Sequence, residues 1–138
     1  MFSKIMVPVD LRHVEALEKA LKVAADLARH YDGEVTYAQV TAPTPGPLGH
    51  TPEEVGEKLE AFAKAEGEKR GHRTAATTII GHDPAIDLDD RLLDATREQK
   101  PDLVVMASHL PNVTDYIWPS HGGHLATHAD CSVMIVRG

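Results

Sequence analysis

The sequence alternates between short apolar runs and longer stretches in which apolar residues recur every three or four positions. Short runs rich in β-branched residues are typical of buried strands, and the longer spacing is typical of amphipathic helices. Because strands and helices alternate regularly, we expect an α/β fold with one open parallel sheet and helices on both faces. The predicted strands are 4–9, 34–41, 74–80, 103–106 and 132–136, and the predicted helices are 14–31, 52–70, 87–99 and 120–128.

Turn signals lie where these elements are expected to end. Asp32 and Gly33 follow the first helix, and we expect the glycine to adopt the left-handed cap conformation. Thr51 precedes a proline and is followed three residues later by Glu54, which predicts a capping box at the start of the second helix. Residues 42–50 contain three prolines and two glycines, a composition that predicts a loop.

Length and charge limit the class of protein. A chain of 138 residues has room for one compact core, so we expect a single domain over 1–138. A net charge of −7 disfavours a nucleic-acid partner, and no apolar run approaches the roughly 20 residues that cross a bilayer. The opening residues MFSKIMVPVD have a strand pattern instead of a signal-peptide pattern, so we expect a cytoplasmic protein. The single cysteine, Cys131, excludes an internal disulfide and is expected to be a packing residue.

In open parallel sheets, ligands bind outside the carboxyl ends of the strands, where the winding reverses. This rule directs attention to residues 8–12, 40–50, 81–84 and 107–119. Asp10 follows a buried strand, and its carboxylate is suited either to ribose hydroxyls or Mg²⁺ or to capping the first helix. The proline-rich segment is either a cover over a ligand or a surface connection.

The start of the last predicted helix is suited to an anion. Helix N-termini combine partial positive charge with unpaired amides, and two glycines after His121 leave those amides unshielded. Ser120 is expected to contact a phosphate or simply to cap the helix. His109, directly after a predicted strand, is either a ligand contact or a hydrogen-bonding residue of its loop.

Three segments, KIMVPVD, DLVVMASH and HADCSVMIVRG, resemble the universal stress protein family. The resemblance covers essentially the whole chain and is greatest to the short bacterial members with an Ala-Ser-His loop, here 107–109. It implies a Rossmann-like, adenine nucleotide alpha hydrolase-like fold with strand order 3-2-1-4-5. It also implies a homodimer formed by antiparallel pairing of the last strand, Ser132 to Val136, whose apolar edge invites such pairing.

The resemblance further implies an adenine nucleotide, ATP or AMP with or without Mg²⁺, across the ends of the first and fourth strands. Carried over by position, Pro8 and Asp10 would hold adenosine, and the backbone of Val40 would face the adenine edge. The residues implied for the phosphates are Ala107, His109, Leu110, Ser120, His121 and Gly122. The chain departs from the family pattern here, because Ala107, Leu110 and Pro119 occupy the three glycine positions.

The expected role is that of a stress-response regulatory protein and not of a metabolic enzyme. The loop 107–123 has no lysine of the P-loop kind, so at most slow ATP hydrolysis is expected. The alternative within the family is an interaction module without nucleotide, in which Leu110, Trp118 and Pro119 fill the phosphate site.

The sequence gives weaker support to two other kinds of site, a metal site and a hydrolytic triad. His121, His124 and His128 share one helical face, but imidazoles spread over two turns converge poorly on one ion, so a solvated face is the favoured interpretation. Ser108 or Ser120 with a histidine and Asp115 would make a hydrolytic triad. The sequence has no Gly-x-Ser-x-Gly motif, so hydrolysis of this kind is not expected.

Overall fold

The computed structural model of the chain describes residues 1–108 and 121–137. In this part of the chain, five strands form one sheet in the order β3-β2-β1-β4-β5, and all neighbouring strands are parallel. The predicted fold class and strand order are therefore confirmed. The strands are β1 (Lys4–Pro8), β2 (Glu34–Thr41), β3 (Arg73–Ile80), β4 (Leu103–Ala107) and β5 (Ser132–Val136).

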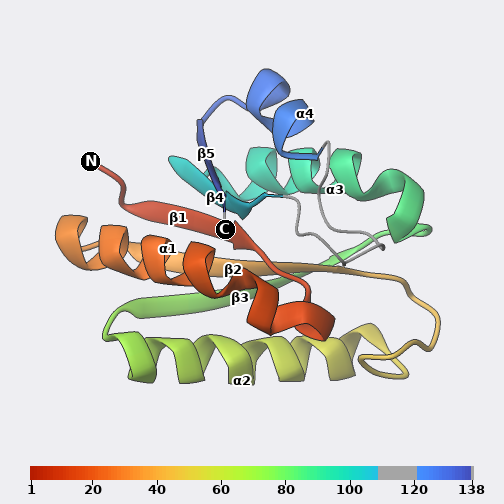
Figure 1. The fold of residues 1–138 in the computed structure, drawn as a ribbon. Helices are drawn as coiled ribbons and strands as arrows, with labels where there is room; N and C mark the ends of the chain where they lie inside the picture. The colour runs from red at the N-terminus through yellow and green to blue at the C-terminus, as the bar shows by residue number, and fades with distance from the viewer. Residues whose placement is uncertain (109–120, 138) are drawn as a thin grey trace.

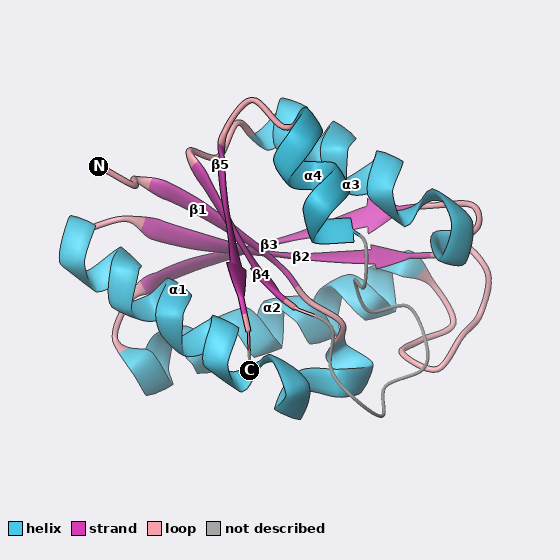
Figure 2. Ribbon diagram, turned by 45° about the horizontal axis from the view of Figure 1, so that its top comes forward, coloured by secondary structure: helices cyan, strands magenta, loops and turns pink. Residues whose placement is uncertain are grey.

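Helices cover both faces of the sheet, as predicted (Figures 1 and 2). The helices α1 and α2 pack on one face, and α3 and α4 lie side by side on the other. A short 3₁₀ helix, η1, connects β1 to α1. The helical elements are η1 (Leu11–Leu17), α1 (Glu18–Tyr31), α2 (Pro52–Arg70), α3 (Pro84–Gln99) and α4 (His121–His128).

Two helix starts differ from the prediction. The first helical segment begins at Leu11 as a 3₁₀ helix, because the side chain of Asp10 accepts a hydrogen bond from the Arg12 amide and caps it. His13, with φ −136°, interrupts the helical conformation within that segment. The third helix begins at Pro84, three residues before the predicted start at 87, and a proline in the first turn costs no hydrogen bond.

The C-cap of α1 corrects another prediction. Asp32, and not Gly33, adopts the left-handed conformation, with φ 52°. Gly33 is required for a different reason, since a Cβ atom built there would lie 2.4 Å from the carbonyl oxygen of Phe2. The close approach brings the next residue into the sheet, where the amide of Glu34 donates to the carbonyl of Ser3.

The predicted cap of α2 forms with one change. The hydroxyl of Thr51 accepts from the amide of Glu54 at 3.2 Å, as in a capping box. The carboxylate of Glu54, however, accepts from the amide of His50 at 2.8 Å, one residue before the expected partner. The cap therefore fixes the end of the 42–50 loop as well as the helix.

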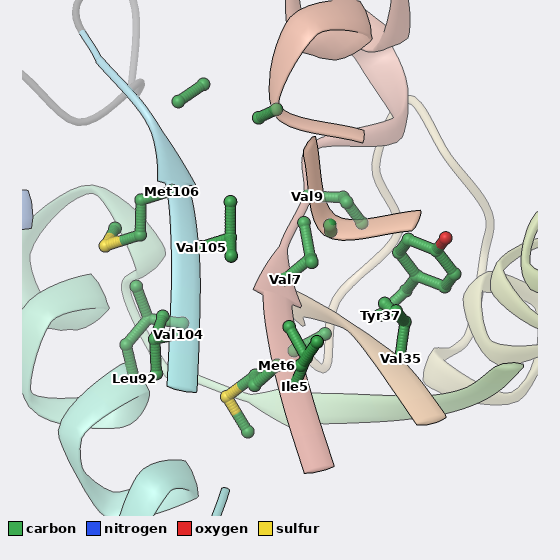
Figure 3. Packing of buried hydrophobic residues seen from close by; sticks show 14 of the residues in the cluster. Ile5, Met6, Val7, Val9, Val35, Tyr37, Leu92, Val104, Val105 and Met106 are labelled. Carbon is green, nitrogen blue, oxygen red and sulfur yellow. The ribbon is translucent and has the colours of Figure 1, made fainter. Parts of the chain in front are cut away.

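The core lies on both faces of the central strands. All five residues of β4 are buried, as the pure apolar run predicted, and Tyr37 in β2 is fully buried. Figure 3 shows members of this core from β1, β2, β4 and α3. Full burial of one such large apolar side chain stabilises the fold by about 1.5–3 kcal/mol. Among the described helices, none has the length and apolar character needed to cross a membrane.

Candidate functional site

A cavity of about 220 Å³ lies at the carboxyl ends of β1 and β2. Its walls come from the end of β2, from the residues that follow β1, from the proline-rich loop, and from α2 and α3, which lie on opposite faces of the sheet. This is the region where open parallel sheets bind ligands. The cavity is the candidate functional site.

Asp10 lines this cavity, although only 5% of the residue is exposed. Its Oδ1 accepts from the backbone amide and from Nε of Arg12, both at 3.0 Å. Its Oδ2 accepts from Nη2 of Arg12 at 2.7 Å. A buried carboxylate needs such pairing, because an isolated charge out of water is costly. The predicted capping role is confirmed, and the position beside the cavity also suits the predicted ligand role.

The backbone of Val40 faces the cavity side of β2. The carbonyl of Ala38 accepts from the amide of Val9 on the β1 side, and the carbonyl of Thr41 accepts from the amide of Gly81 on the β3 side. Because backbone groups alternate in direction along a strand, those of Val40 point to the β1 side. Strand β1 ends at Pro8, which pairs with Ala38. Val40 therefore lies past the last position at which β1 pairs with β2.

Gln39 is a site residue that the sequence analysis missed. It is buried and lines the cavity, and its Oε1 accepts from the amide of Leu11 at 2.9 Å. Its Nε2 donates to the carbonyl of Val40 at 3.0 Å. One side chain thus ties the start of η1 to the end of β2. The available signal was an amide side chain near the end of a strand whose interior positions are buried.

The proline-rich loop forms part of the cavity wall. Thr44, Pro45 and Pro47 line the cavity, so the segment covers the site and is not only a surface connection. Gly46 and Gly49 close the loop through two backbone hydrogen bonds of 3.0 and 3.2 Å. The hydrogen bond from the His50 amide to the Glu54 carboxylate joins the end of this loop to α2.

Four of the other predicted site residues have a described position in the backbone. Pro8 and Ala107 end the neighbouring strands β1 and β4 and are buried, but neither lines the cavity. His121 and Gly122 are the first two residues of α4. The predicted phosphate contacts His109, Leu110 and Ser120 lie outside the described residues, as do Trp118, Pro119 and Asp115. Among the predicted residues that the structure describes, Asp10 and Val40 line one cavity.

A second polar cluster lies under the end of α2 and contributes no residue to this cavity. The hydroxyl of Tyr37 lies 3.0 Å from Nε2 of His72, and Nε of Arg70 donates to Glu66 at 2.7 Å. Burial lowers the pKa of His72 and raises the pKa of Tyr37 above its usual value. Arg70 also donates two hydrogen bonds of 2.9 Å to Glu18, which lowers the pKa of that carboxyl. These contacts join β2 to the segment that follows α2, and α2 to α1.

The histidines of α4 pack against each other. The rings of His124 and His128 stack with centroids 4.4 Å apart, and Nδ1 of His128 lies 2.9 Å from the carbonyl of His124. Within residues 1–108 and 121–137, no three His, Cys, Asp or Glu side chains with described positions are grouped as metal ligands. The side chain of His121 is not among those described.

Comparison with known proteins identifies the family. Universal stress protein G of Salmonella typhimurium is 26% identical over 148 residues, which span 99% of this chain and 100% of that protein. The universal stress protein from Archaeoglobus fulgidus in complex with dAMP has a TM-score of 0.67 and 18% identity, with 97% of each chain covered. A universal stress protein family protein from Arabidopsis thaliana with AMP bound has a TM-score of 0.65 and 16% identity, covering 98% of this chain and 91% of that one.

At these identities the two structures show a shared fold, and fold alone does not establish function. The family model for universal stress proteins matches residues 1–137 of the sequence. The chain therefore belongs to the universal stress protein family.

Proposed function

We propose that this protein binds an adenine nucleotide, ATP or AMP, and acts as a stress-response regulatory protein and not as a metabolic enzyme. The observation that carries the proposal is that Asp10 and the backbone of Val40 meet at one cavity. Structures with the same fold hold dAMP and AMP, which supports an adenine nucleotide as the ligand class.

The cavity suits the adenosine part of the ligand. Val9, Val55 and Leu88 give it apolar walls, as a purine ring requires. The backbone of Val40, on the β1 side of β2, offers a polar edge to the base, and Asp10 offers a carboxylate to the ribose hydroxyls. Pockets for whole drug-sized ligands measure roughly 300–1,000 Å³. A cavity of about 220 Å³ therefore matches adenosine better than a complete ATP molecule.

We place the phosphates toward β4 and the start of α4. Ala107 ends the strand next to β1, and the amides of His121 and Gly122 begin α4. An N-terminal helical turn attracts phosphate because its amides lack intrahelical partners. His109, Leu110 and Ser120 complete the proposed set, and Mg²⁺ would accompany a triphosphate.

We also propose a homodimer through β5. This strand is at one edge of the sheet, and its Met134 and Ile135 are large apolar residues with substantial exposure. Edge strands with unpaired backbone groups and apolar side chains favour pairing with another strand. Antiparallel pairing of Ser132–Val136 with the same strand of a second copy would cover both features.

Isothermal titration calorimetry with ATP, AMP and a cyclic nucleotide, each with and without Mg²⁺, tests the function. We expect binding of at least one nucleotide, and we expect Asp10→Ala to weaken it because the ribose loses its acceptor. Asp26→Ala, which removes an exposed carboxylate on α1, is the matched control and should leave the affinity unchanged. Absence of heat with every nucleotide would refute the proposal and favour the interaction module.

A further inference from the structure

The cavity lining has more carboxylates than cationic side chains among the described residues, which is unfavourable for an anionic ligand. Two carboxylates, Asp10 and Asp83, lie on its wall. Among the lining residues that the structure describes, Arg12 is the one cationic side chain. A phosphate that approached the carboxylates alone would be repelled, and repulsion between like charges is strongest where water is scarce. Among these lining residues, Arg12 is therefore the side chain whose charge suits a phosphate group close to Asp10.

The geometry holds Arg12 in place for such a role. Its Nε and Nη2 atoms form a forked pair with the carboxylate of Asp10, at 3.0 and 2.7 Å. The Asp10 side chain is 7% exposed, whereas that of Arg12 is 30% exposed. The buried partner thus fixes one side of the guanidinium, and part of the cation remains accessible to solvent. Arginine suits this arrangement because its planar group presents donors in fixed directions.

Asp10 retains capacity for the ribose while it holds Arg12. An ionised carboxylate accepts about four hydrogen bonds. The three recorded here come from the amide, Nε and Nη2 of Arg12, and only one of them reaches Oδ2. A ribose hydroxyl can therefore bond to Oδ2 without breaking the pair.

We infer that Arg12 contacts the phosphate group nearest the ribose, with Asp10 as its positioning residue. The inference rests on the proposed adenine-nucleotide function and extends it to ligand selection. The cavity would then favour phosphorylated nucleosides over free nucleosides, because adenosine has no anionic group to pair with Arg12.

The experiment compares adenosine with AMP by calorimetry on the full chain. We expect the wild type to bind AMP more tightly than adenosine, since charge-assisted hydrogen bonds are strong. Arg12→Ala should weaken AMP binding by roughly tenfold to hundredfold and leave adenosine binding nearly unchanged. Arg73→Ala, which removes an exposed arginine at the start of β3, is the control for net charge and should change neither affinity.

A second variant keeps the test valid if loss of the buried pair disturbs the fold. Arg12→Gln keeps a polar side chain with N–H donors but removes the positive charge. It should lose the preference for AMP to a similar extent, and its thermal unfolding midpoint shows at which temperature the folded variant is compared with the wild type. Equal weakening of adenosine and AMP by both variants would overturn the inference and leave the proposed function intact. Failure of the wild type to bind either ligand would instead refute the proposed function itself.

Discussion

The hydroxyl of Tyr37 lies 3.0 Å from Nε2 of His72, and this contact joins β2 to the residue that precedes β3. Tyr37 is fully buried and also packs against Phe62 of α2, with ring centroids 5.2 Å apart. A buried hydroxyl needs a partner, and here the histidine supplies it. The contact therefore ties the sheet to the end of α2, on the face opposite α3 and α4.

Removing this hydroxyl should destabilise the protein modestly. Tyr37→Phe keeps the ring packing but leaves Nε2 of His72 without its partner. We expect the free energy of unfolding to fall by about 1 kcal/mol, the usual net value of one hydrogen bond. Urea unfolding followed by circular dichroism measures the change. Tyr31→Phe, at the less buried end of α1, is the control and should have a smaller effect. An effect of Tyr37→Phe no larger than that of the control would contradict the assigned contact.

Stability should fall as the solution becomes acidic, partly because of His72. Burial lowers the pKa of His72 in the folded state, nearby Arg29 and Arg70 lower it further, and Glu66 opposes them. The unfolded chain therefore takes up a proton near pH 6.5, before the folded protein does. Below that pH the unfolded state gains protons that the native state lacks, so the free energy of unfolding decreases until His72 titrates in the fold.

Urea unfolding at several pH values between about 7 and 5 checks this sign. His72→Gln should reduce the dependence on pH in that range, because glutamine does not titrate. His82→Gln, which replaces an exposed histidine in the loop after β3, is the matched control and should keep the pH dependence of the wild type. Identical pH dependence in the wild type and His72→Gln would show that other groups cause the acid effect.

Gln39 should contribute more to the free energy of unfolding than a neutral side chain usually does. It accepts from the Leu11 amide and donates to the Val40 carbonyl, so both polar ends are used inside the protein. Gln39→Glu keeps the acceptor but loses the donor, and places a carboxylate against a carbonyl oxygen. We expect a loss of about 1–3 kcal/mol in unfolding free energy. Gln99→Glu on the less buried end of α3 is the control, and a loss equal to the control's would rule out the proposed link.

The fold could be predicted from the sequence because it follows from periodicity. Alternating short apolar runs and helical stretches define the element order, and the buried run 103–106 marks a central strand. Helix boundaries were less predictable, since they depend on contacts distant in sequence. Asp32 ends α1 in the left-handed conformation, and the next residue, Gly33, lies close to the carbonyl of Phe2, a contact made only in the folded protein.

The site could be predicted only in part. Asp10 follows from its place at the end of a strand, and Val40 was implied by the family resemblance; the topology brings the two strand ends together. The roles of Arg12 and Gln39 depend on where long polar side chains fold back, and local spacing does not encode that. Arg12 bonds to a residue two positions away, whereas Gln39 reaches Leu11, 28 positions away. The predicted phosphate contacts His109, Leu110 and Ser120 remain predictions.

Gly33 should tolerate no side chain. A Cβ atom there would lie 2.4 Å from the Phe2 carbonyl oxygen, which belongs to the backbone and cannot rotate away. Gly33→Ala should therefore displace the segment before β1 and lower the thermal unfolding midpoint by several degrees, the expected size for a loss of about 1 kcal/mol or more. Gly46→Ala is the matched control, because a Cβ atom there meets nothing within 4 Å. Equal midpoints for the two variants would contradict this packing.

The proposed dimer depends on the apolar edge at β5. Ile135 is 40% exposed on this strand, and Ile80 is 52% exposed at the end of β3, the opposite edge of the same sheet. Ile135→Lys should shift the protein from dimer to monomer in sedimentation velocity, since a lysine on an edge strand opposes pairing. Ile80→Lys changes charge and apolar surface in the same way and should leave the dimer intact. A monomeric wild type would refute the dimer, and dissociation by Ile80→Lys alone would assign the interface to β3 instead.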